Sequence, residues 1–114
     1  MVMVKHTVLT SIDPKWPASL SPKIHKYLRE KLGFKGVIVT DSLTMEAPQK
    51  WTGSNGKAAV QAVLAGNDLI CTGSAKGEYE AVLKAVRKGK IKESRINESV
   101  QRILELKLSK GIIK

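Results

Sequence analysis

The sequence predicts an α/β protein in which parallel strands alternate with helices. Three short apolar runs, at residues 2–9, 36–40 and 68–72, are each followed by a polar turn or loop and then by a helical pattern. This alternation is typical of parallel strands joined by right-handed crossovers. Of the 114 residues, 42% are hydrophobic and 26% are charged, so we expect one soluble, folded domain over residues 1–114.

The first strand and the first helix are indicated by separate signals. Residues 2–9 are mainly β-branched or apolar, which predicts a buried strand. Two prolines and a tryptophan in residues 11–20 then indicate a loop. We expect Ser21 to cap a helix that starts at Pro22 and ends at Gly33, because Pro is favoured at the first helical position and Gly just past the last.

The second unit is centred on a strand at residues 36–40. Its sequence, GVIVT, lacks polar alternation, as expected of a strand that is covered on both faces. A long loop over residues 42–56 follows, and long loops in compact domains are usually functional or mobile. A helix over residues 57–65, ended by Gly66, completes this unit.

The third unit begins with a strand at residues 68–72 and continues with a helix at residues 78–88. Apolar residues at helical spacing over residues 93–110 predict a last, amphipathic helix. A sheet of only three strands has two edges with unpaired backbone groups. We therefore expect these edges to be covered by other segments of a longer parent protein, by a partner chain or by a second copy of this chain.

The charge of the chain, formally +10 at pH 7, raises the question of an anionic partner. Between residues 76 and 114, eleven basic residues alternate with five acidic ones on expected helices. Interleaved charges usually form a solvated helix face. Because the chain has only five aromatic residues and no aromatic-basic interleaving, a nucleic-acid-binding module is the least favoured function.

Membrane, metal and cofactor functions are not indicated. No run approaches the roughly 18 uninterrupted apolar residues of a membrane span, and the first residues lack the pattern of a signal peptide. The compartment is not indicated by the sequence: a cytoplasmic protein and one secreted as part of a longer parent are both open alternatives. Cys71 has no partner at metal-ligand spacing, and GSNGK at residues 53–57 lacks the first glycine of a phosphate-binding loop.

Asp41 is the residue best placed for chemistry. It directly follows the central strand, and the loops after the carboxyl ends of parallel strands build the active sites of such folds. A carboxylate just past a buried strand is costly unless it is hydrogen-bonded or used. From its spacing alone, a catalytic acid and a structural acid bonded to backbone amides are equally favoured.

Five segments, in the same order along nearly the whole chain, make this sequence similar to glycoside hydrolase family 3. The run LREKLGFKGVIVTDSLTMEA, residues 28–47, resembles the signature that presents the nucleophile of this family. Asp41 stands at the position of the nucleophile. The segments MVMVKH, PASLSPKI, AVLAGNDL and INESVQRILELKLSKG resemble the bacterial β-N-acetylhexosaminidase branch.

This resemblance implies a partial (β/α)8 barrel, consisting of its last three βα units plus the C-terminal helix. A whole barrel takes roughly 200–250 residues or more, so this sequence is expected to be a fragment with little activity alone. The implied reaction is a retaining displacement in which Asp41 attacks the anomeric carbon. The implied substrate carries terminal N-acetylglucosamine, as in peptidoglycan turnover, and the family's other sugar-binding and proton-transfer residues cannot be placed in this chain.

Weaker candidates for sugar contact are His6, Ser42 and Met45. Ser42 replaces a second acid that many relatives carry, and its hydroxyl can still donate a hydrogen bond. For His6, a partly buried structural role is favoured over contact with the sugar. Met45 and Trp51 are equally suited to walling a sugar pocket and to anchoring the loop. His25, between two lysines, is expected on the surface.

A second hypothesis is that the chain is a folded, non-catalytic barrel remnant. Its sheet edges would then pair between copies and complete a barrel-like core. This hypothesis predicts a homo-oligomer, whereas the enzymatic one predicts a carbohydrate substrate and missing strands supplied from elsewhere.

Overall fold

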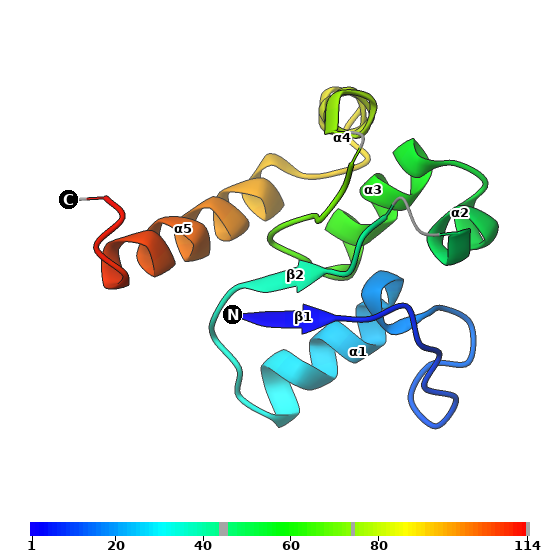
Figure 1. Ribbon diagram of the computed structural model, residues 1–114, viewed down its shortest axis with the longest axis horizontal. Coiled ribbons are helices and arrows are strands. Elements are labelled where there is room, and N and C mark those ends of the chain that lie inside the picture. Colours follow the sequence, from blue (N-terminus) through cyan, green and yellow to red (C-terminus); the bar gives the residue numbers. More distant parts are fainter. Residues whose placement is uncertain (44–45, 74, 114) are drawn as a thin grey trace.

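The computed structural model describes residues 1–43, 46–73 and 75–113, and it is an α/β fold that is mostly helical (Figure 1). The elements, in chain order, are β1 (Val2–Val4), the 3-10 turn η1 (Ala18–Leu20), α1 (Pro22–Lys26), the π-helical turn η2 (Tyr27–Lys31), β2 (Ile38–Thr40), α2 (Glu46–Thr52), α3 (Asn55–Ala65), α4 (Ala75–Arg87) and α5 (Glu93–Ser109).

The two strands are parallel, and β2 lies between β1 and a third segment. β1 pairs with β2 so that Val4 lies opposite Thr40. On the other side of β2, Leu69 forms an isolated parallel bridge with Val39. The third segment therefore runs in the predicted direction, but the strand predicted at residues 68–72 is reduced to one bridge.

The side chain of Thr40 explains why the third strand is so short. Its hydroxyl accepts a hydrogen bond from the N–H of Cys71 at 3.1 Å, so this N–H does not enter a ladder with β2. The carbonyl oxygen of Cys71 accepts instead from the N–H of Leu43, beyond the end of β2, at 2.9 Å. The main-chain groups of Cys71 are therefore bonded to the Thr40 side chain and to the Leu43 N–H, and they are not available to extend the ladder with β2.

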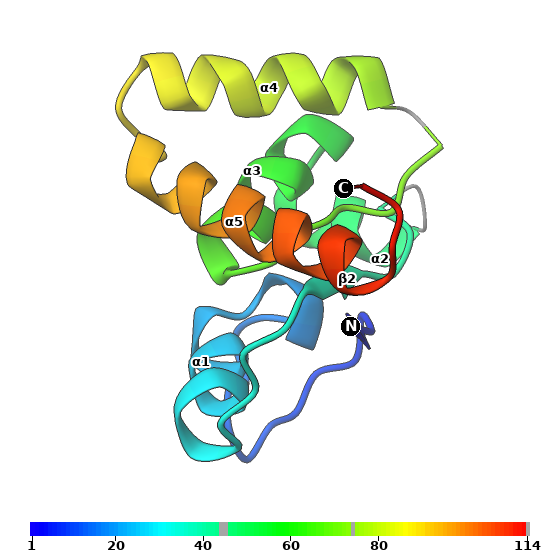
Figure 2. The same cartoon turned by 90° about the vertical axis from the view of Figure 1, so that its left-hand side faces the viewer.

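Helices lie on both faces of the small sheet (Figure 1). On one face, Ile24 of α1 packs with Val4 and Ile38. α3 lies on the other face, and α4 packs outside α3 through contacts that include Val63 and Ala85 (Figure 2). The side chain of Ile38 is fully buried, as the unbroken apolar run of this strand predicted.

The first helix begins as predicted and changes geometry part-way. The Ser21 hydroxyl accepts the N–H of Ile24 at 3.1 Å, and Pro22 occupies the first helical position. From Tyr27 the helix is π-helical. Gly33 follows with a φ of 68°, a left-handed conformation that glycine adopts most easily.

The other helices differ from the prediction mainly at their N-termini. The predicted loop over residues 42–56 contains α2, whose first turn accommodates Pro48 because no intrahelical N–H is needed there. α3 begins at Asn55, where the Ser54 hydroxyl accepts the N–H of Lys57 at 3.2 Å as an N-cap. α4 begins at Ala75 rather than at residue 78.

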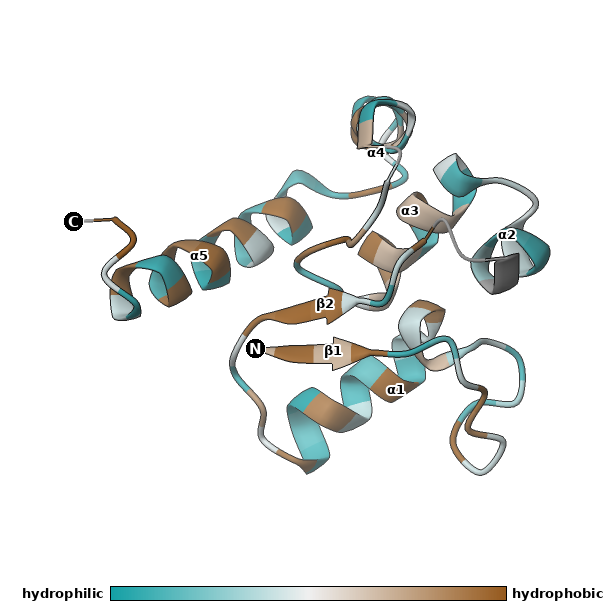
Figure 3. Ribbon diagram, in the orientation of Figure 1, coloured by the Kyte–Doolittle hydropathy of each residue, from teal (hydrophilic) through white to brown (hydrophobic). Residues whose placement is uncertain are grey.

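α5 extends away from the rest of the chain and leaves apolar side chains uncovered (Figures 1 and 3). Val100, Leu104 and Leu108 are 46%, 46% and 53% exposed. Met3 of β1 is also exposed, and no described segment pairs with the outer edge of β1. None of the helices in the described ranges is long and apolar enough to cross a membrane.

Candidate functional site

Asp41 lies at the carboxyl end of β2, where strand pairing fixes its main chain. Its N–H donates to the carbonyl oxygen of Val4 at 3.0 Å, one residue beyond the end of β2. Its Oδ1 accepts the N–H of Ser42 at 2.8 Å. The residue is partly exposed. The sequence therefore places a carboxylate that is oriented by the backbone and still accessible at this end of the sheet.

His6 joins the loop after β1 to the turn after β2. Its Nε2 lies 2.8 Å from the carbonyl oxygen of Ser42, and its Nδ1 lies 2.6 Å from the hydroxyl of Ser19. Because a carbonyl oxygen only accepts, Nε2 is the donor in the bond to Ser42. His6 thus holds the Asp41–Ser42 turn in place, and its contact with a sugar stays a prediction.

Two main-chain hydrogen bonds hold Ser42. Its N–H donates to Oδ1 of Asp41, and its carbonyl oxygen accepts from Nε2 of His6. The structure brings these three predicted site residues together at one end of the sheet. Met45, the fourth, lies outside the described residues. Within the described ranges, no group of three or more His, Cys, Asp or Glu residues is arranged to hold a metal ion.

Asp68, at the opposite end of β2, carries a buried carboxylate that links distant elements. Its side chain is inaccessible and accepts hydrogen bonds from the N–H of Ile38 at 3.0 Å and the hydroxyl of Ser99 at 2.7 Å. Two guanidinium groups complete the cluster, Arg29 at 2.8 Å and Arg102 at 2.9 Å. Burial raises the pKa of Asp68, but these hydrogen bonds and the nearby positive charge outweigh burial and hold the pKa below its ordinary value.

Arg29 also organises the turn that leads into β2. Besides Asp68, its guanidinium donates to the carbonyl oxygens of Phe34 and Gly36. The guanidinium carbon lies 5.6 Å from the centre of the Phe34 ring. The partnership with Asp68 was not predicted from the sequence; the available signal was an acidic residue directly before an apolar run, at the start of a predicted strand.

The prediction that His25 lies on the surface is wrong. The residue is only 3% exposed, and its Nδ1 lies 2.8 Å from the carbonyl oxygen of Ser21. Its ring packs on Gly66, where a Cβ would lie 3.1 Å from the Cβ of His25. The flanking lysines face solvent while His25 follows the buried side of the helix, and burial lowers the pKa of its imidazole.

Most of this chain matches a known protein family. Residues 1–106 match the model of the glycosyl hydrolase family 3 N terminal domain. The chain belongs to glycoside hydrolase family 3. This family membership confirms the resemblance seen in the sequence, and the parallel α/β class of the fold agrees with it.

Relatives within family 3 are much longer than this chain. An uncharacterized secreted glycosyl hydrolase of Arthroderma benhamiae is 35% identical over 112 residues, covering 93% of this chain and 31% of the relative. A β-hexosaminidase of Nitrosomonas eutropha is 39% identical over 70 residues, covering 60% of this chain and 20% of the relative. This chain thus spans a third or less of the length of either relative.

A solved family 3 structure shows the same arrangement of elements. The glycoside hydrolase family 3 β-N-acetylglucosaminidase from Paenibacillus sp. str. FPU-7 has a TM-score of 0.83 and 42% sequence identity to this chain. The match covers 90% of this chain and 20% of the Paenibacillus chain.

Proposed function

We propose that this chain carries the nucleophile of a retaining glycosidase and that Asp41 is the attacking carboxylate. The observation that carries the proposal is the position of Asp41 directly after β2, within the family 3 signature run, partly exposed and oriented by the N–H of Ser42. A nucleophile needs this combination of access and fixed geometry, because the reacting atoms must meet in line.

The proposed reaction follows the two-step course of retaining glycosidases. Since Oδ1 of Asp41 accepts the N–H of Ser42, Oδ2 attacks the anomeric carbon as the bond to the leaving group breaks. A second group protonates the leaving oxygen and later removes a proton from the water that releases the sugar. His6 and Ser42 act as positioning residues for Asp41 in this scheme.

We propose further that the chain forms the last three βα units of a (β/α)8 barrel. Two observations support this arrangement: the segment around Leu69 continues the parallel order on one side of β2, and the outer edge of β1 has no partner among the described residues. Earlier strands of a longer polypeptide or of a partner chain would pair with β1. The proposed substrate is a terminal β-linked N-acetylglucosaminide.

Release of the aryl group from an activated aryl N-acetyl-β-glucosaminide tests the role of Asp41. An activated leaving group needs little protonation, so a working nucleophile can be detected without the missing acid. We expect slow release by the native chain, loss of that release in Asp41→Asn, and no change in Glu105→Gln, which removes an exposed acid on α5. Equal release by the native chain and Asp41→Asn would contradict the proposal.

The sugar is tested separately with an aryl β-glucoside, because the relatives of this chain include proteins named β-glucosidase as well as β-hexosaminidase. We expect faster release from the N-acetylglucosaminide. Faster release from the β-glucoside would contradict the proposed substrate but not the proposed role of Asp41.

A second candidate function, the self-associating remnant, is favoured by the exposed apolar face of α5 and by the free edge of β1 in the described part of the sheet. It predicts that the mass measured by light scattering rises with protein concentration and that Leu104→Lys reduces this rise. A compact monomer at every concentration would rule out this candidate.

A further inference from the structure

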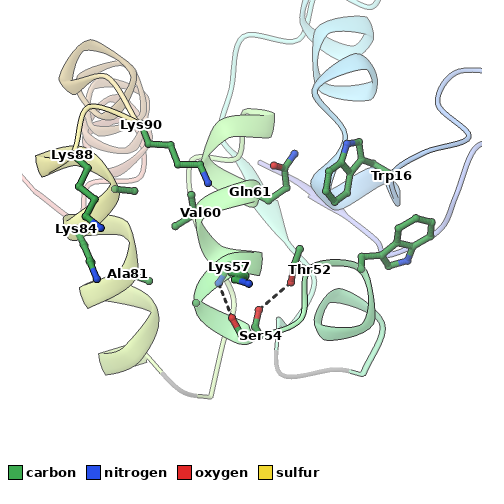
Figure 4. A pocket seen from close by; sticks show the side chains of 13 residues that line it. Trp16, Thr52, Ser54, Lys57, Val60, Gln61, Ala81, Lys84, Lys88 and Lys90 are labelled. Carbon is green, nitrogen blue, oxygen red and sulfur yellow. Dashed lines mark hydrogen bonds between the residues drawn. The ribbon is translucent and has the colours of Figure 1, made fainter.

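A groove on the solvent side of α3 gathers aromatic and cationic side chains (Figure 4). It encloses about 630 Å3, and Val60 and Gln61 of α3 form part of its floor. Lys84 of α4 and Lys88, directly after α4, lie on one side of α3, and Trp16 lies on the other. None of Asp41, Ser42 or His6 lines this groove. The groove is therefore a feature separate from the proposed nucleophile site.

The aromatic side of the groove is a pair of indole rings. Trp16, in the loop after β1, and Trp51, near the end of α2, have ring centres 6.4 Å apart at an interplanar angle of 41°. Trp51 is 42% exposed. An exposed tryptophan beside a second one forms an apolar surface on which the faces of sugar rings can pack.

The opposite side is cationic. Lys84, Lys88 and Lys90 line it, Lys57 lies at the start of α3, and the described lining includes no acidic residue. Within the described ranges none of these lysines takes part in an ion pair. Lys84, on α4, and Lys88, directly after the last residue of α4, are four residues apart, a spacing at which like charges disfavour a helix. Their positive charge is therefore unneutralised where the groove is open.

Two contacts connect the floor of this groove to the elements beside it. A Cβ at Gly56 would lie 3.1 Å from the Cβ of Ala81, so glycine at this position lets α4 pack closely against the start of α3. The amide nitrogen of Gln61 donates to the carbonyl oxygen of Leu20 at 2.9 Å, which ties the floor to η1, close after Trp16 in the sequence. The floor of the groove is thus connected both to α4 and to the segment that carries Trp16.

We propose that this groove binds an acidic oligosaccharide. Its sugar rings pack on Trp16 and Trp51, and its carboxylate, sulfate or phosphate groups lie against Lys84, Lys88 and Lys90. A neutral glycan would leave the like-charged lysines unneutralised. A single-stranded nucleic acid would need ring faces spaced for successive bases, whereas the two indoles lie tilted against each other and form one surface.

The fluorescence of the protein reports on this groove directly, because both tryptophans of the chain line it. We expect a hexamer of galacturonic acid to change the emission in a saturable way. Lys84→Gln/Lys88→Gln should weaken binding about tenfold, since two exposed charge contacts are lost. The matched control Lys107→Gln/Lys110→Gln removes the same charge from the end of α5 and the residue directly after it, and should leave the dissociation constant unchanged.

Each comparison probe separates the proposal from an alternative. If a hexanucleotide of thymidine binds more tightly than the galacturonate hexamer, the proposal is overturned in favour of nucleic acid. If a neutral N-acetylglucosamine hexamer binds as tightly as the galacturonate hexamer, the proposed role of charge is wrong. Equal weakening by both lysine pairs would indicate attraction by net charge alone. No change in emission would also overturn it.

Two further variants keep the test independent of folding and of catalysis. Lys90→Gln lies after α4 and cannot disturb that helix, and it should weaken binding of the galacturonate hexamer in the same direction. Asp41→Asn should bind the hexamer as the native chain does. A failure of the nucleophile proposal therefore leaves this inference standing, and the reverse also holds.

Discussion

Two aspartates near opposite ends of β2 have surroundings that suit them to different roles, one structural and one proposed to be catalytic. Asp68 is inaccessible and bonded by two arginines, a serine and a backbone N–H. Asp41 is partly exposed and accepts the N–H of Ser42. A carboxylate neutralised on every side has no capacity to attack a substrate, whereas one held by a backbone bond keeps that capacity.

Replacement of Asp68 by Asn should destabilise the chain strongly. Removal of the buried carboxylate leaves Arg29 without an acidic partner and Arg102 with only Glu98, 3.9 Å away, a loss of about 3 kcal/mol in the free energy of unfolding. Urea unfolding followed by circular dichroism measures this change, with Glu105→Gln as the control for an exposed acid. Unfolding curves that coincide for Asp68→Asn and the native chain would show that the cluster contributes nothing.

The burial of His25 should make stability depend on pH. Because burial lowers the pKa of His25 below its ordinary value of 6.5, the unfolded chain takes up a proton first as the pH falls. The contribution of His25 is therefore fully present above 6.5 and is lost as the pH falls towards the lower pKa of the folded state. Asp13 and Asp68, whose pKa values are lowered from 3.8, add a similar loss only in more acidic solution.

Unfolding in urea at about pH 7.5, 6.5 and 5.5 tests this dependence in the range where histidine titrates. The free energy of unfolding should fall across the series for the native chain, and His25→Gln should flatten the decline. An undiminished decline in His25→Gln would assign the pH dependence to other groups.

At the scale of elements, the features that depend on neighbouring residues in the sequence were predictable, and the features that depend on tertiary contacts were not. GVIVT predicted a buried β2 with Asp41 at its end, and Ser21 with Pro22 predicted the start of α1. The short third strand depends on the Thr40 hydroxyl, which no hydrophobic pattern reveals. Likewise, His6 meets Ser42 only because β1 and β2 pair in their observed register.

Replacement of Thr40 by Val tests the origin of the short third strand. Val keeps the shape of the buried side chain but removes the acceptor for the N–H of Cys71. We expect the free energy of unfolding to fall by about 1 kcal/mol. Amide hydrogen exchange at Cys71 should also become faster. Unchanged protection of that amide would show that the Thr40 hydroxyl does not hold the segment.

At the scale of the whole molecule, the chain has uncovered surfaces and lacks most of its relatives' length. The outer edge of β1 has no partner in the described part of the chain, and α5 exposes apolar residues. The chain covers 20% of the Paenibacillus enzyme, with which it shares 42% identity. In the barrel that we propose, segments outside this chain would supply the other residues of the site.

The most direct measurement is the activity of a hybrid in which this chain replaces the matching segment of the Paenibacillus enzyme. If Asp41 is the nucleophile, the hybrid should hydrolyse an aryl N-acetyl-β-glucosaminide and release the β-anomer first, as a retaining mechanism requires. Asp41→Asn should reduce the rate at least about a thousandfold, because Asn cannot form the glycosyl-enzyme bond, and Glu105→Gln should leave it unchanged. A hybrid that is equally active with Asn at position 41 would contradict the central claim.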